Sequence, residues 1–118
     1  LALRASGEKV VRDRIFEMLE KLGLDERAEH LPSALSAGQK RRLVLGRALL
    51  SCHDVLLADE PTNDLDAEWS ECVFELLRGF CADEERSVVL VTHDRSYAAR
   101  ADSMYLLEGG KLREVAEQ

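Results

Sequence analysis

Two short apolar runs separated by a helix-forming stretch most constrain the fold of this chain. Residues 54–59 and 87–91 are rich in Val and Leu, and the helix-forming stretch runs from Leu65 or Asp66 to about Phe80. Apolar runs without alternation are typical of strands buried on both faces. A strand-helix-strand order predicts a right-handed crossover between parallel strands. We therefore expect an α/β fold.

The carboxyl edge of this sheet is the place where a site is expected. The first run ends on Asp59-Glu60, and the second is followed by Thr92-His93. A carboxylate such as Asp59 can hold Mg²⁺ through its water shell, and Glu60 beside it can orient or deprotonate an attacking water. The imidazole of His93 can donate to a phosphate. The alternatives are a solvated acidic loop and a polar surface histidine.

A third feature is the segment Ser36, Ala37, Gly38 and Gln39 at the start of a helix of about 15 residues. Free amides at a helix N-terminus attract anions, Ser36 adds a hydroxyl donor, and Gly38 lets a phosphate approach the backbone. Ordinary helix capping by Ser36 is the alternative interpretation.

The remaining elements are predicted as follows. Residues 8–22 form an amphipathic helix that Gly23 ends, with its apolar stripe at Val11, Ile15, Met18, Leu19 and Leu22. A helical turn follows from Asp25 until Leu31-Pro32, and another helix covers residues 94–101. Residues 104–107 and 112–115 form a hairpin. We divide the chain into residues 1–50 and residues 51–118.

Composition excludes several classes of protein. The 118 residues carry 16 Lys and Arg against 23 Asp and Glu, a formal net charge of −7, which disfavours a general nucleic-acid binder. No run approaches the roughly 20 apolar residues that cross a bilayer. The cysteines Cys52, Cys72 and Cys81 lack the spacing of a metal or redox motif, so we expect reduced thiols and a cytoplasmic setting.

Together these segments resemble the C-terminal half of the nucleotide-binding domain of ABC-type ATPases. Residues 35–39 resemble the signature motif, residues 55–60 the Walker B motif, residues 61–66 the D-loop, and residues 91–94 the switch-histidine loop. The resemblance covers residues 8–115. It implies a partial P-loop NTPase fold with part of the helical subdomain and a C-terminal β-hairpin.

The resemblance also implies roles for individual residues and names the ligands ATP and Mg²⁺. Asp59 would take the Mg²⁺ position, Glu60 would be the general base or the water-orienting carboxylate, and His93 would reach the γ-phosphate. Residues 36–39 would bind the γ-phosphate of ATP held by the opposite subunit of a head-to-tail dimer. Asp66 would communicate across that dimer.

The chain departs from a complete site in one major respect. Phosphoryl-transfer sites of this kind need a glycine-rich loop with a Lys, and the pattern Gly-x4-Gly-Lys-Ser/Thr occurs nowhere in the sequence. That loop and the glutamine loop would lie upstream of Leu1. We therefore expect the chain alone to be inactive and its uncovered strands to favour self-association. Ala37 stands where the family most often has Gly, and Asn63-Asp64 differs from the commonest D-loop residues.

Three functions are compatible with these motifs. The first is the ATP-hydrolysing subunit of a membrane transporter, bound to transmembrane permease subunits at the inner face of the cell membrane without direct nucleic-acid contact. Residues 58–62 resemble those of lipoprotein-release and macrolide-export ATPases. The second is an ABC-F translation factor acting on the ribosome, although Gln39 is more often Glu in that group. A degenerate structural copy is disfavoured by intact Asp59, Glu60 and His93.

Overall fold

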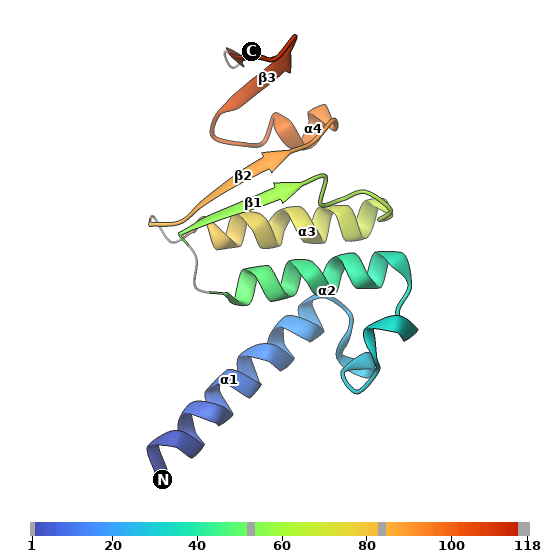
Figure 1. Ribbon diagram of the computed structural model, residues 1–118, viewed down its shortest axis with the longest axis vertical. Coiled ribbons are helices and arrows are strands. Elements are labelled where there is room, and N and C mark those ends of the chain that lie inside the picture. The colour runs from blue at the N-terminus through green and yellow to red at the C-terminus, as the bar shows by residue number, and fades with distance from the viewer. Residues whose placement is uncertain (1, 52–53, 83–84, 116–118) are drawn as a thin grey trace.

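The computed structural model of the chain describes residues 2–51, 54–82 and 85–115, and side chains from residue 7 onward (Figure 1). Its elements are α1 (Ala2–Lys21), the 3-10 turns η1 (Asp25–Arg27) and η2 (Pro32–Ala34), α2 (Ala37–Leu50), β1 (Val55–Asp59), α3 (Ala67–Phe80), β2 (Ser87–Val91), α4 (Arg95–Ala98), β3 (Met104–Glu108) and β4 (Lys111–Val115). The predicted α/β class is confirmed.

The two apolar runs form a parallel pair, as predicted. β1 and β2 are in register from Val55 opposite Ser87 to Asp59 opposite Val91, and α3 makes the crossover between them. Both strands therefore end at the same edge. The core lies between this sheet and the helices, and its buried members are Leu49, Leu56, Ala58, Val73, Leu77 and Phe80.

The expectation that both faces of the strands are buried was wrong. In β1, Leu56 and Ala58 are buried, whereas Leu57 is 75% exposed. In β2, Val89 and Val91 are also more than half exposed. The reason is that α2 and α3 lie on the same side of the strands (Figure 1), and no element among the described residues covers the other side.

Helix α1 is longer than predicted and only its last turns are packed. Val11 and Ile15, assigned to the apolar stripe, are exposed, while Leu22 is fully buried. A Cβ at Gly46 of α2 would lie 2.5 Å from Cδ1 of Leu22, so this glycine permits the close approach of the two segments. Figure 1 shows the rest of α1 projecting away from the other elements.

Gly23 ends α1, as predicted. Its φ is +62°, its N–H donates to the Glu20 carbonyl at 3.0 Å, and the N–H of Leu24 donates to the Leu19 carbonyl at 2.8 Å. These paired bonds are those of a Schellman cap. The predicted turn after Asp25 is η1, and the Pro32 that was expected to break it begins η2.

The C-terminal elements differ from the predictions in length. α4 covers only four residues, because the chain beyond it tightens into turns in which Arg100 and Ala101 bond three residues back. The side chain of Arg100 reaches Glu71 and Glu75 on α3. The predicted hairpin is confirmed, with the two-residue turn Gly109-Gly110 between Glu108 and Lys111.

The other expectations concern cysteines, membrane spans and domains. Cys72 and Cys81 are free thiols, and Cys52 lies outside the described residues. No helix in the described ranges is both long enough and apolar enough to cross a membrane. α2 ends at Leu50, and the division between residues 1–50 and residues 51–118 stays a prediction.

Candidate functional site

Glu60 and His93 meet at the carboxyl edge of the parallel strands. The N–H of Glu60 donates to the carbonyl of Val91 at 2.8 Å, which extends the ladder one residue beyond β1. The side chain of Glu60 then turns toward the segment after β2. Its Oε1 accepts the backbone N–H of His93 at 3.0 Å and lies 2.9 Å from His93 Nδ1.

This contact favours the protonated, positively charged form of His93. The hydrogen bond that the ring donates to Glu60 raises the pKa of the imidazole above its ordinary value, and the negative charges of Glu60 and Asp94 act in the same direction. The charged form carries an N–H on both ring nitrogens. With Nδ1 engaged by Glu60, the Nε2–H of this exposed side chain is available to a further acceptor such as a phosphate oxygen.

The two oxygens of Glu60 have different surroundings. Oε1 is held by His93, whereas Oε2 is buried and receives no hydrogen bond from any residue that the structure describes. A buried carboxylate oxygen without a donor is costly, because ionised oxygens need hydrogen bonds. Oε2 is therefore the oxygen of Glu60 that is free to accept a proton or a hydrogen bond.

Asp59, the expected Mg²⁺ ligand, is the last residue of β1 and is exposed. Across the described ranges, no three His, Cys, Asp or Glu side chains gather closely enough to hold a metal by themselves. Mg²⁺ keeps several waters and commonly uses one or two carboxylates together with substrate phosphates. The single accessible carboxylate of Asp59 fits that mode.

The segment Ser36–Gln39 forms a capping box at the start of α2. Oγ of Ser36 accepts the N–H of Gln39 at 3.2 Å, and Oε1 of Gln39 accepts the N–H of Ser36 at 2.9 Å. Capping and anion binding are compatible, since the Ser36 hydroxyl proton and the side-chain NH₂ of Gln39 take no part in these bonds. Ala37 and Gly38 occupy the first helical turn, whose N–H groups lack partners within the helix.

The predicted D-loop lies beside this helix start. A Cβ on Gly38 would stand 3.4 Å from the carbonyl oxygen of Asp64 and from Cδ2 of Leu65, so the two segments are in close contact. Asp66 caps α3, its Oδ1 accepting the N–H of Trp69 at 2.8 Å. The structure thus places the site residues in two groups, Glu60 with His93 and Ser36–Gln39 with the D-loop.

Arg41 joins these groups, and sequence analysis missed it. Its Nη1 donates to the backbone carbonyl of Glu60 at 2.8 Å, and its Nη2 lies 3.4 Å from Oδ2 of Asp64. The partners are 19 and 23 residues away, so no local sequence pattern could reveal them. Arg42, also unforeseen, is buried with its guanidinium 3.6 Å from the ring centre of Trp69.

Comparison with known proteins identifies the family. The family model described as "ABC transporter" matches residues 4–63, about half of the chain. The chain belongs to the ABC transporter family. The match includes the signature segment, β1, Asp59 and Glu60, so the resemblance predicted from the sequence is confirmed.

Curated relatives from the ABC transporter family share substantial identity with the chain. The lipoprotein-releasing system ATP-binding protein LolD of Xanthomonas campestris is 44% identical over 107 residues, which are 91% of this chain and 45% of that protein. LolD of Francisella tularensis is 43% identical over 99 residues, which are 84% of this chain and 43% of that protein. The chain spans about half the length of these relatives.

Solved ABC structures share the fold. The dimeric ATP-binding cassette MJ0796 bound to ADP and Pi is 36% identical with a TM-score of 0.79, and the match covers 91% of this chain and 47% of that one. A bacterial Atm1-family ABC exporter with ATP bound gives a TM-score of 0.69 at 23% identity, which shows the fold alone. The predicted partial ABC ATPase fold is confirmed.

Proposed function

We propose that this chain forms the signature and switch half of an ATPase cassette that hydrolyses ATP to drive transport across a membrane. The observation that carries the proposal is the convergence of His93 on Oε1 of Glu60 at the end of two parallel strands, with Oε2 lacking a hydrogen-bond partner among the described residues. ATP-binding subunits such as LolD, with which the chain shares 44% identity, support the transport role.

Each site residue has a role that its surroundings support. Glu60 accepts the proton of the attacking water at Oε2 or aligns that water, because Oε1 is already engaged. His93 holds Glu60 through Nδ1 and donates from Nε2 to the γ-phosphate. Asp59 would hold Mg²⁺ through water, and the ion would supply charge neutralisation for the phosphates.

The signature segment acts on a second cassette. Ser36, Ala37, Gly38 and Gln39 present a hydroxyl, the free N–H groups of a first helical turn and a side-chain amide, all suited to a phosphate. We propose that they bind the ATP held by the opposite subunit in a head-to-tail dimer, and that Asp66 lies at the same interface. The dimeric state of MJ0796 supports this arrangement.

We further propose that the cassette binds transmembrane permease subunits and is held by them at the inner face of the cell membrane. The second hypothesis, an ABC-F translation factor, is not favoured, since the relatives described above are transporter ATP-binding proteins.

The catalytic role is tested in a chimaera in which the part of this chain that aligns with Xanthomonas campestris LolD, over 107 residues, replaces the corresponding segment of that protein. We expect Glu60→Gln to lower kcat for ATP about 100-fold or more while ATP binding persists. Glu114→Gln on the exposed hairpin is the matched control and should leave kcat unchanged. Normal turnover by the Glu60→Gln chimaera would show that Glu60 is not the catalytic carboxylate.

The 118-residue chain by itself is expected to hydrolyse no ATP, since it contains no Gly-x4-Gly-Lys-Ser/Thr sequence. The chain alone should also bind ATP weakly at best, and isothermal titration with MgATP measures that binding. Saturable submicromolar binding to the chain alone would contradict the expectation.

A further inference from the structure

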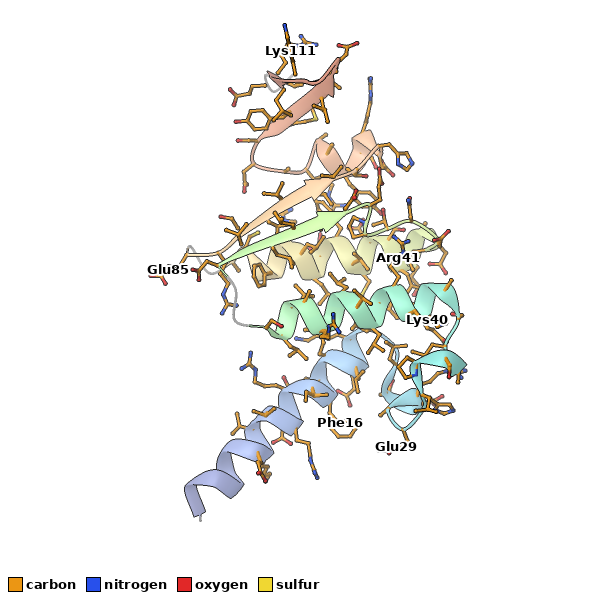
Figure 2. All side chains as sticks on the ribbon, in the orientation of Figure 1. Phe16, Glu29, Lys40, Arg41, Glu85 and Lys111 are labelled. Atoms are coloured by element: carbon orange, nitrogen blue, oxygen red, sulfur yellow. The ribbon has the colours of Figure 1, made fainter. Side chains whose placement is uncertain are left out.

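Arg41 holds two neighbouring points of the loop that follows β1. From the second turn of α2, its Nη1 donates to the Glu60 carbonyl at 2.8 Å in a partly buried bond, and its Nη2 reaches Oδ2 of Asp64 at 3.4 Å. Figure 2 labels Arg41 on the side toward which β1 and β2 run. The fork of a guanidinium is rigid, so both contacts fix one orientation of the side chain.

Both points held by Arg41 have unusual backbone conformations. Glu60 has a φ of +45° and Asp64 a φ of +63°, and they are the only non-glycine residues with positive φ among those described. Such values are uncommon for residues with a Cβ and persist only where surrounding contacts hold them. The Glu60 carbonyl also accepts the N–H of Asn63 at 3.2 Å, so both of its lone pairs are used.

The same helix that carries Arg41 begins at the signature segment. Ser36 caps α2, and Arg41 stands five positions later on that helix, which is a rigid body over this distance. A continuous series of contacts therefore runs from Ser36 through α2 and Arg41 to Glu60, and from Glu60 to His93.

We propose that Arg41 is a positioning residue for ATP hydrolysis. Its side chain stabilises the left-handed backbone conformation of Glu60, and thereby holds the catalytic carboxylate at a fixed place relative to the signature segment of the same chain. The inference rests on the proposed function, since it needs Glu60 to act on ATP. Lys cannot replace Arg41 fully, because one ammonium group cannot make the same forked contact.

Amide hydrogen exchange of the 118-residue chain tests the structural part. In Arg41→Met, the amides of Asn63 and His93, which donate to Glu60, should exchange at least about ten-fold faster than in the unaltered chain. The amide of Ser70, which donates to the Asp66 carbonyl at 2.9 Å, should keep its rate. Lys40→Met, an exposed neighbour on α2, is the matched control and should change none of them.

Two outcomes would overturn the positioning role. One is unchanged exchange at Asn63 and His93 in Arg41→Met, and the other is equal acceleration at Ser70, which would mean a general loss of stability. Arg41→Lys separates these cases if the Met variant folds poorly. It keeps the charge and one contact, so exchange at Asn63 should be intermediate, and a rate equal to that of the unaltered chain would refute the need for the fork.

Kinetics in the LolD chimaera test the functional part. Arg41→Met should lower kcat about ten-fold and leave KM for ATP within about two-fold, because misplacement of a catalytic group affects the chemical step. Unchanged kcat in a chimaera whose turnover still depends on Glu60 would refute the inference alone. Turnover independent of Glu60 would refute the proposed function, and the exchange result would still decide whether Arg41 fixes the turn.

Discussion

Two groups of His93 converge on one oxygen of Glu60. The backbone N–H lies 3.0 Å and the ring Nδ1 2.9 Å from Oε1, although the residues are 33 positions apart in the chain. The backbone hydrogen bond fixes the position of the main chain at His93, and the ring hydrogen bond fixes the direction of its side chain. The orientation of the imidazole therefore depends on a single carboxylate. The hydrogen bond and the charge of that carboxylate also raise the pKa of His93.

We expect Glu60→Gln to lower the pKa of His93. The hydrogen bond and charge of Glu60 raise the pKa of this imidazole in the folded chain, so their removal shifts the titration toward lower pH. The stabilisation from the pair is fully present below the unfolded pKa of histidine, about 6.5, and is lost as pH rises through the elevated folded pKa. NMR titration of the His93 ring protons measures the shift.

The matched control for this titration is Glu114→Gln, which removes an exposed carboxylate on β4. It should leave the His93 titration unchanged. An identical His93 titration in Glu60→Gln and in the unaltered chain would mean that the pair does not form in solution.

Ser36 combines a structural and a functional role, and two substitutions separate them. Ser36→Ala removes the capping bond to Gln39 and should lower the free energy of unfolding by about 1 kcal/mol. Ser36→Asp keeps a capping oxygen but replaces the hydroxyl donor with a negative charge that repels phosphate. The Asp variant should therefore retain stability in urea denaturation and lose ATPase activity in the LolD chimaera.

Full ATPase activity in the Ser36→Asp variant would show that Ser36 does not bind phosphate and serves only as the N-cap of α2. A Ser36→Ala variant as stable as the unaltered chain would show that the capping box contributes nothing.

Local patterns were enough to predict most of the fold and the placement of Glu60 and His93 at one edge of the sheet, but not the hydrogen bonds between them. The parallel order of β1 and β2 follows from the crossover rule, and that order alone brings the two strand ends together. The apolar run in β1 predicts burial of Leu57, but burial depends on what covers a strand, and the described residues cover one side only. The residue types of a strand do not indicate whether one or both of its faces are covered.

Contacts between distant side chains were beyond the reach of sequence patterns. Arg41 reads as an ordinary solvent-facing residue of an amphipathic helix, and its selection of the Glu60 carbonyl depends on how α2 packs beside β1. The same holds for Arg42, which is buried with its guanidinium over the ring of Trp69 on α3. The contacts of Arg100 with Glu71 and Glu75 on α3 likewise join residues that are far apart in the sequence.

Gly23 is expected to tolerate no side chain. A Cβ there would lie 2.6 Å from a carbon of the Trp69 ring, and that ring is held on its face by Arg42. Gly23→Ala adds the cost of a left-handed φ to this overlap and should lower the free energy of unfolding by roughly 2–4 kcal/mol. Urea denaturation followed by fluorescence of the single tryptophan measures it.

Gly79→Ala is the control for this measurement, because a Cβ at that exposed position in α3 meets no atom within 4 Å. It should raise stability by up to about 1 kcal/mol through helix propensity. Equal effects of the two substitutions would contradict the packing of Gly23 on Trp69.

The exposed side of β1 and β2 should make the 118-residue chain self-associate. Leu57 is 75% exposed, Val89 is 52% exposed, and parallel strands with an open apolar face and free edges are prone to pair with another copy. Leu57→Lys places a charge at the centre of this face and should shift the chain toward monomer in sedimentation velocity. Leu31→Lys, at a position 74% exposed but remote from the strands, should leave association unchanged. A chain that remains monomeric across a wide concentration range, or equal effects of the two lysines, would mean that this face does not drive association.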